Sequence, residues 1–148
     1  MPVEIRPRPF APWLELGQYQ DRHLPPGAFG ACAAFVGSMR DFNCGERVHA
    51  MTLEHYAGMT ERQLTRLTET ALARHRLIDV LLLHRIGDLR PNDPIVLVAA
   101  WSVHRADAFA ACREMMETLK SRATFWKKES TRGGERWVES NTPAFEDR

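Results

Sequence analysis

Two long segments of the chain carry hydrophobic residues at helical spacing. In residues 59–75 the apolar positions recur along one stripe, and most charged residues lie off that stripe. A second segment with this pattern follows residues 104–108 and continues to about Arg122. We therefore predict two amphipathic helices, each with one face against a sheet. The stripes are formed by Leu64, Leu67 and Ala71 and by Phe109, Cys112, Met116 and Leu119.

Shorter apolar or alternating runs, bounded by proline and glycine, predict the strands of that sheet. The run from Ile95 to Val103 is almost entirely apolar, which is typical of a central strand. Gly30 predicts close approach of a helix or another backbone. Strands and helices together indicate an α/β (α+β) fold. The predicted strands are Val3–Ile5, Ala28–Val36, Val48–His55, Asp79–Ile86, Ile95–Val103, Phe125–Ser130 and Arg136–Glu139, and a short helix opens at Pro12–Leu16.

Length, charge and cysteine content narrow the class of protein. A chain of 148 residues suits one domain over residues 1–148, with residues 141–148 as a mobile polar tail. The net charge of +1 argues against a nucleic-acid binder, so any anion site must be local. No run is long and apolar enough for a membrane span, and no signal peptide is visible. Three cysteines without a Cys-x-x-Cys motif argue against a metal site or disulfide frame and predict a cytoplasmic protein.

The positive charges are distributed unevenly between arginine and lysine. The chain contains seventeen arginines but only three lysines, and all three lysines fall within residues 120–128. An ammonium group can lose its proton, whereas a guanidinium group cannot. We interpret this segment as one wall of an active site. The alternative is a cluster of solvated lysines beside Trp126, since runs of charge usually form solvated surfaces.

The predicted elements separate the three lysines. Lys120 falls in the last turn of the second helix, where the helix dipole favours a charged amine. In the strand that follows, Lys127 shares one side with Glu129, while Lys128 points to the other side. Only one of the two adjacent lysines can therefore face the same pocket as Lys120, and periodicity does not decide which.

Two further segments carry cations next to strand ends. Arg40 follows a strand and stands in a loop that allows unusual backbone angles; it could bind a ligand or pair with Asp41. His104 and Arg105 stand at a strand-to-helix junction, where free helix N–H groups favour anions. Asp107 could instead cap that helix and neutralise Arg105. No nucleophile stands out, because Cys44 is the only loop cysteine and cysteine is most often a small buried residue.

A cationic pocket without a nucleophile suits a reaction whose nucleophile arrives with a substrate. Five motifs then stand in order at compatible spacing, and together they resemble the large, catalytic subunit of molybdopterin synthase over residues 30–139. Met39 and Cys44 depart from the pattern expected for that family. The motifs are Phe35–Asn43, Leu53–Met59, His84–Gly87, His104–Arg105 and Phe125–Glu129.

The resemblance implies a hammerhead-type fold: an antiparallel sheet covered by two main helices, with a small added β-subdomain. It implies a homodimer that binds two ubiquitin-like sulfur-carrier small subunits, giving a heterotetramer. The C-terminal thiocarboxylate of the small subunit would supply sulfur to cyclic pyranopterin monophosphate in two rounds, forming the dithiolene of molybdopterin. This pterin is a substrate, and the resemblance implies no bound metal or other cofactor.

The resemblance also assigns residues. Lys120 and Lys127 correspond to essential catalytic lysines, which would also contact the substrate. A binding module for a ubiquitin-like partner, without catalysis, is the alternative, and a phosphate cradle distinguishes the enzyme from it. The other substrate-binding positions are Ser38, Met39, Arg40, His104, Arg105, Lys128 and Glu129.

Overall fold

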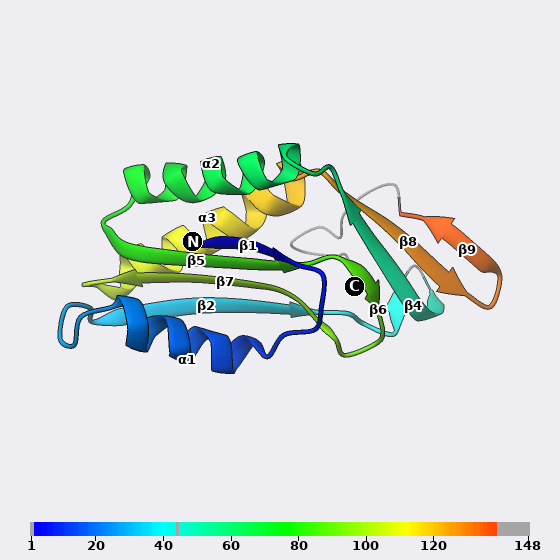
Figure 1. The fold of residues 1–148 in the computed structure, drawn as a ribbon, viewed down its shortest axis with the longest axis horizontal. Helices are drawn as coiled ribbons and strands as arrows, with labels where there is room; N and C mark the ends of the chain where they lie inside the picture. Colours follow the sequence, from blue (N-terminus) through cyan, green and yellow to red (C-terminus); the bar gives the residue numbers. More distant parts are fainter. Residues whose placement is uncertain (1, 44, 139–148) are drawn as a thin grey trace.

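The computed structural model describes residues 2–43 and 45–138. Its larger sheet has the strand order β1-β5-β7-β2. The β5–β7 and β7–β2 pairs are antiparallel, as predicted, and β1 runs parallel to β5, so the sheet is mainly antiparallel with one parallel pair. Figure 1 shows the four strands side by side. Their bounds are Val3–Arg6 (β1), Leu77–Arg85 (β5), Pro94–Ser102 (β7) and Ala31–Ser38 (β2).

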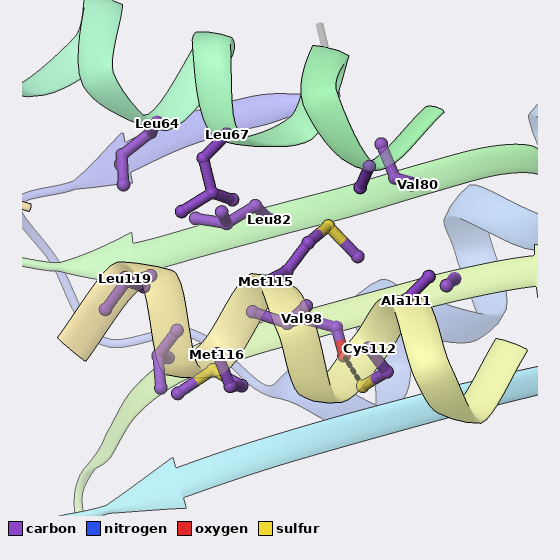
Figure 2. Packing of buried hydrophobic residues seen from close by; sticks show 13 residues of the cluster. Leu64, Leu67, Val80, Leu82, Val98, Ala111, Cys112, Met115, Met116 and Leu119 are labelled. Atoms are coloured by element: carbon purple, nitrogen blue, oxygen red, sulfur yellow. Dashed lines mark hydrogen bonds between the residues drawn. The ribbon is translucent and has the colours of Figure 1, made fainter. Parts of the chain in front are cut away.

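The two predicted amphipathic helices cover one face of this sheet. Helices α2 (Met59–Arg74) and α3 (Arg105–Arg122) lie together on that face, and α1 (Pro12–His23) lies on the opposite face (Figure 1). The core beneath α2 and α3 contains the predicted stripe residues (Figure 2). Phe109 is the exception, since 67% of it is exposed. It lies at the border of the buried arc of α3 and lines an open groove along β2.

Helix α1 is longer than the sequence pattern predicted. Residues after Leu16 are mostly polar, so they carry no apolar stripe to mark a helix. Tertiary contacts hold this part of α1 against the sheet: Tyr19 stacks on Trp101 with ring centroids 5.5 Å apart. The indole N–H of Trp101 donates to Gln20 Oε1 over 3.1 Å. Packing on the second face of the sheet therefore extends the helix beyond its local signal.

A second sheet lies at one end of the first and matches the predicted small β-subdomain (Figure 1). Its strand order is β3-β4-β8-β9, with β6 paired to β4. The sequence analysis missed β3 and β6, because strands of two or three residues carry no readable alternation. The bounds are Phe42–Asn43 (β3), Glu46–His55 (β4), Gly87–Leu89 (β6), Phe125–Thr131 (β8) and Gly134–Trp137 (β9).

The end of β2 differs from the prediction in a way that affects the site. The strand starts at Ala31 rather than Ala28 and continues through Ser38, so Ser38 is a strand residue and not a loop residue. The expected close approach at Gly30 is confirmed, since a Cβ atom there would lie 2.3 Å from the carbonyl oxygen of Val103. Within residues 2–43 and 45–138, no helix is long and apolar enough to cross a membrane.

Candidate active site

Lys120 and Lys127 lie together where the two sheets meet. Lys120 is in the last turn of α3, and Lys127 is the third residue of β8. Both line a cavity of about 110 Å³ that also includes Ser38, Arg40 and Glu129. An adjoining cavity of about 80 Å³ shares both lysines. The fold therefore brings together side chains from β2 and the segment after it, from α3 and from β8.

The short connection between α3 and β8 fixes the relative position of the two lysines. The helix ends at Arg122, and its C-cap Ala123 has an extended backbone. Thr124 then contacts α2: its N–H and its hydroxyl donate to Gln63 Oε1 over 2.9 Å and 2.6 Å, and its carbonyl accepts from the Thr60 hydroxyl over 2.9 Å. These bonds hold the turn to α2 immediately before β8 begins.

The two amines influence each other's protonation. The pKa of Lys127 is lowered to about 8, and burial is the largest cause. The nearby amine of Lys120 and the guanidinium of Arg40 contribute to this lowering, while Glu129 opposes it. Burial also lowers the pKa of Lys120, again with a contribution from Arg40. The hydrogen bond between the amines opposes the shift in Lys120 and adds to the shift in Lys127. Lys120 is therefore the favoured ammonium donor, and Lys127 the favoured neutral amine.

Glu129 is a buried carboxylate whose position is fixed by hydrogen bonds. Both of its oxygens accept from Asn43 Nδ2, each at 3.1 Å, and Oε1 also accepts from Arg136 Nε at 3.3 Å. Arg136 is shared with Glu46, at 2.8 Å. The sequence analysis did not identify Asn43 or Arg136 as supports of the site. Asn43 is 86 residues away from Glu129 in the sequence, and Arg136, which stands opposite Glu129 in the β8–β9 hairpin, was predicted only as a strand residue.

The structure decides which of the adjacent lysines faces Lys120. Lys128 points away from the cavity, and its amine pairs with Glu135 at 2.8 Å on the exposed side of the β8–β9 hairpin. Lys127 is the residue on the cavity side. Glu129 shares that side, as the alternation predicted, and Lys128 does not line the cavity described here.

The segment Ser38–Met39–Arg40 is held in place by backbone bonds. Met39 N donates to the carbonyl of Asp93 over 2.9 Å, and Met39 O accepts from Asn92 N over 2.8 Å. The Met39 side chain is buried in a small core with Leu89 of β6 and with residues of β4, and Met39 also lines the cavity. Arg40 is exposed and lines the cavity.

The alternative pairing of Arg40 with Asp41 is not what the structure shows. The carboxylate of Asp41 pairs with Arg47 at 3.2 Å. Arg40 is instead close enough to both lysine amines to lower their pKa values. The guanidinium is therefore directed to the cavity, where an anionic ligand would neutralise three neighbouring cations.

His104 and Arg105 do not join this cavity within one chain. Both are exposed at the start of α3. Lys120 follows Arg105 by fifteen residues on the same helix, which corresponds to about 22 Å along the axis. Within one chain, therefore, the structure does not bring these two residues to the lysine cavity. The predicted length of this helix already implied that its first and last turns are this far apart.

His84 is a further residue of the site that was not among the predicted site residues. His84 is buried in β5 and lines the smaller cavity together with Lys120 and Lys127. It belongs to a motif that the sequence analysis quoted only for the resemblance. His84 and Leu82 are two positions apart in β5, so they lie on the same face of the strand, and Leu82 belongs to the core. This spacing would have indicated that His84 points toward α3.

Other chemistries find less support in the described residues. No group of three or more His, Cys, Asp or Glu side chains in residues 2–43 and 45–138 could hold a metal ion. Burial raises the pKa of both Cys32 and Cys112 to about 11, so neither thiol is activated. Cys44, the loop cysteine considered above, lies outside the described residues, as do residues 141–148 of the predicted tail.

Comparison with known proteins gives consistent matches. The family described as MoaE protein matches residues 13–122. The molybdopterin synthase catalytic subunit of Ralstonia nicotianae is 55% identical over 111 residues, covering 75% of this chain and 63% of that protein. The protein of the same name from Pseudomonas aeruginosa is 45% identical over 139 residues, covering 94% of this chain and 91% of that protein.

A solved structure agrees with these sequence matches. The crystal structure of molybdopterin synthase from Staphylococcus aureus superposes with a TM-score of 0.83 at 28% identity. The superposition covers 93% of this chain and 97% of that chain. The structural similarity therefore extends over most of the length of both chains.

Proposed function

The chain belongs to the MoaE family, whose named relatives are catalytic subunits of molybdopterin synthase, and on that premise we propose that it transfers sulfur to cyclic pyranopterin monophosphate. The donor is the C-terminal thiocarboxylate of a ubiquitin-like small subunit. The product, after two rounds, is the dithiolene of molybdopterin. A cytoplasmic location and a heterotetramer built on a homodimer of this chain are parts of the same proposal.

The observation that carries this proposal is the partly buried Lys120–Lys127 pair on the wall of a cavity. One amine with a pKa of about 8 beside a second, charged amine provides a base and a cation at one place. The two described cysteines are not activated as nucleophiles, because burial raises the pKa of each thiol. This pattern favours a reaction in which the sulfur nucleophile is brought by the partner.

The proposed chemistry assigns a different role to each lysine. The thiocarboxylate sulfur attacks a side-chain carbon of the pterin and forms a C–S bond while a C–O bond at that carbon breaks, which leaves the small subunit attached as a thioester. The displaced oxygen leaves as water or, where the cyclic phosphate opens, stays on the phosphate. Water then cleaves the thioester, so the sulfur stays on the pterin and the small subunit leaves as a carboxylate. The Lys120 ammonium stabilises the oxyanion that forms at the terminal glycine, and the neutral Lys127 amine accepts and returns protons.

Arg40 binds the phosphate in this proposal, because it is the cavity cation that has no role in proton transfer. Ser38, Met39, Lys128 and Glu129 remain predicted substrate contacts, and Glu129 also favours the charged form of Lys127. His104 and Arg105 also remain predicted substrate contacts. Since one chain keeps them about 22 Å from Lys120, they meet the same substrate only if a second copy of the chain supplies them. A two-fold dimer with antiparallel α3 helices would do so.

The test is single-turnover conversion of the pterin by mass spectrometry, with a thiocarboxylated small subunit and with the carboxylate form. We expect product only with the thiocarboxylate. Lys120→Ala and Lys127→Ala should each reduce the rate by about 100-fold or more, the range for removing a general acid or base. Near-normal rates in both folded variants would contradict the assignment. If neither the unaltered protein nor any variant converts the pterin although the small subunit binds, the result would favour the alternative of a binding module without catalysis.

Substrate binding tests the phosphate assignment separately. Arg40→Ala should weaken binding of the pterin phosphate, and Arg105→Ala should do so only in the assembled dimer. Arg47→Ala is the matched control, because Arg47 is an exposed arginine that pairs with Asp41 and does not line the cavity. Unchanged affinity for Arg40→Ala would remove Arg40 from the phosphate site.

A further inference from the structure

His84 is a buried histidine beside the lysine pair. It lies near the end of β5 and is flanked by Ile5 of β1 and Val96 of β7 in the sheet. Only 4% of it is exposed. Its side chain nevertheless borders the cavity of about 80 Å³ that Lys120 and Lys127 also line. A polar ring at this depth therefore faces the site rather than bulk water.

Two contacts fix the orientation and tautomer of the ring. Nδ1 lies 2.8 Å from the carbonyl oxygen of Arg85. A carbonyl oxygen only accepts, so Nδ1 carries the proton and donates. The ring also stacks on Phe125, with centroids 3.8 Å apart and planes inclined by 12°. Nε2 is consequently left with a lone pair, and it has no hydrogen-bond partner among residues 2–43 and 45–138.

The surroundings keep this ring neutral. The pKa of His84 is lowered to about 3, chiefly by burial and in smaller part by the charges of Lys120, Lys127 and His55, while the hydrogen bond to the backbone of Arg85 opposes the shift. Three groups with charge or polarity surround the two lysine amines: Arg40 from the segment after β2, Glu129 from β8 and His84 from β5. A neutral acceptor is the group that an ammonium needs where two further cations are close by.

We propose that His84 is a positioning residue for Lys120: its Nε2 accepts a hydrogen bond from the Lys120 ammonium, directly or through one water molecule in the smaller cavity. This bond favours the charged form of Lys120. Of the two amines, Lys127 is then the one that loses its proton more easily. The inference rests on the proposed function for its catalytic meaning. The contact itself belongs to the ligand-free protein, so it can be measured without turnover.

The chain offers an unusually simple measurement, because it contains three lysines. Lysine labelled with ¹³C at Cε gives three titrating NMR signals, and the exposed Lys128 serves as an internal control. Three variants separate the functions of the ring. His84→Gln places an amide oxygen near the position of Nε2 and so keeps an acceptor there. His84→Asn keeps only a donor near the position of Nδ1, and His84→Phe keeps only a ring that can stack on Phe125. We expect the Lys120 titration to fall by about half a pH unit or more in the Asn and Phe variants, as for loss of one hydrogen bond.

The Gln variant should titrate closer to the unaltered protein, and Lys128 should not move. The alkaline limb of the pH–rate profile should shift downward in the same order, a change that a merely structural role of His84 would not cause. Unchanged Lys120 titration in folded Asn and Phe variants would overturn the proposal.

If the variants do not fold, the unaltered protein still decides the question. Two-bond ¹H–¹⁵N correlations of the imidazole report its tautomer, and a proton on Nε2 would overturn the proposal. Failure of the proposed function has a different signature, namely no turnover with the thiocarboxylated partner while the Lys120–His84 coupling persists.

Discussion

The two sides of β8 carry the same residue type in different environments. Lys127 faces the cavity, where burial and the neighbouring cations lower its pKa to about 8. Lys128, the next residue, lies on the other side and is partly exposed, and its hydrogen bond and charge interaction with Glu135 raise its pKa. The Lys128 amine also lies 5.8 Å from the centre of the Trp137 ring. One residue step along a strand thus separates a candidate proton acceptor from a solvated surface charge.

The difference shows that the reactivity of a lysine here comes from its surroundings. Both amines have an acidic neighbour, since Glu129 stands near Lys127 and Glu135 near Lys128. Burial and two further cations outweigh the carboxylate on the cavity side, whereas the interactions with Glu135 outweigh desolvation at Lys128. Paired substitutions on the two sides should therefore give unequal results.

The largest expected effect comes from replacing each lysine with arginine. Lys127→Arg keeps a positive charge but removes a group that can be deprotonated, so single-turnover sulfur transfer should fall by about 100-fold or more. Lys128→Arg should leave the rate near that of the unaltered protein. Equal rates for the two variants would show that proton transfer by Lys127 is not required.

Stability should respond in the opposite direction. The pKa of Lys127 is lowered in the folded state, so below about pH 8 the folded protein bears the cost of a buried charge that the unfolded chain does not. Lys127→Met should therefore raise the free energy of unfolding at pH 7 by about 2 to 3 kcal/mol.

The sign of this effect fixes its pH dependence. The unfolded state binds more protons between about pH 8 and the ordinary lysine pKa of 10.5, so the unaltered protein gains stability over this window and the advantage of Lys127→Met shrinks. Urea unfolding at several pH values measures it. Lys128→Met serves as the control and should give no such gain; a gain independent of pH would refute the buried-charge explanation.

The aromatic residues on the two sides of β8 give the next test. Phe125 packs against the core beneath α2 and α3 and stacks on His84, whereas Trp126 is 46% exposed and contacts Tyr56 edge to face. Phe125→Ala should reduce the free energy of unfolding by about 2 kcal/mol, less than for a fully buried ring. Trp126→Ala should cost about 1 kcal/mol or less. Thermal and urea unfolding measure both losses. If Trp126→Ala destabilised the protein more than Phe125→Ala, the assignment of Phe125 to the core side of β8 would be wrong.

The smallest expected effect concerns Glu129. Glu129→Gln keeps the shape of the side chain but removes the charge that supports the Lys127 ammonium. The pKa of Lys127 should fall further, and the acidic limb of the pH–rate profile should move to lower pH. Glu135→Gln is the matched change on the other side and should lower only the pKa of Lys128. NMR titration of the three lysine signals distinguishes the two outcomes.

Much of the fold could be predicted because its signals are local. The stripes of α2 and α3 and the apolar runs of β5 and β7 are periodic over many residues, and the structure confirms these elements. Local signals failed where tertiary packing decides the outcome. The polar half of α1 is held by Tyr19 on Trp101, and the two-residue strand β3 exists through its pairing with β4.

The sequence alone determined that the chain's only lysines lie within one short segment and that Lys127 and Lys128 face opposite ways, because composition and strand alternation are properties of the chain itself. Only the tertiary structure decided that Lys127 is the one beside Lys120, that His84 borders the same cavity, and that His104 and Arg105 lie at the far end of α3. The physical reason is that burial and charge depend on distances between elements. Those distances are set when the sheets and helices pack, and no local pattern encodes them.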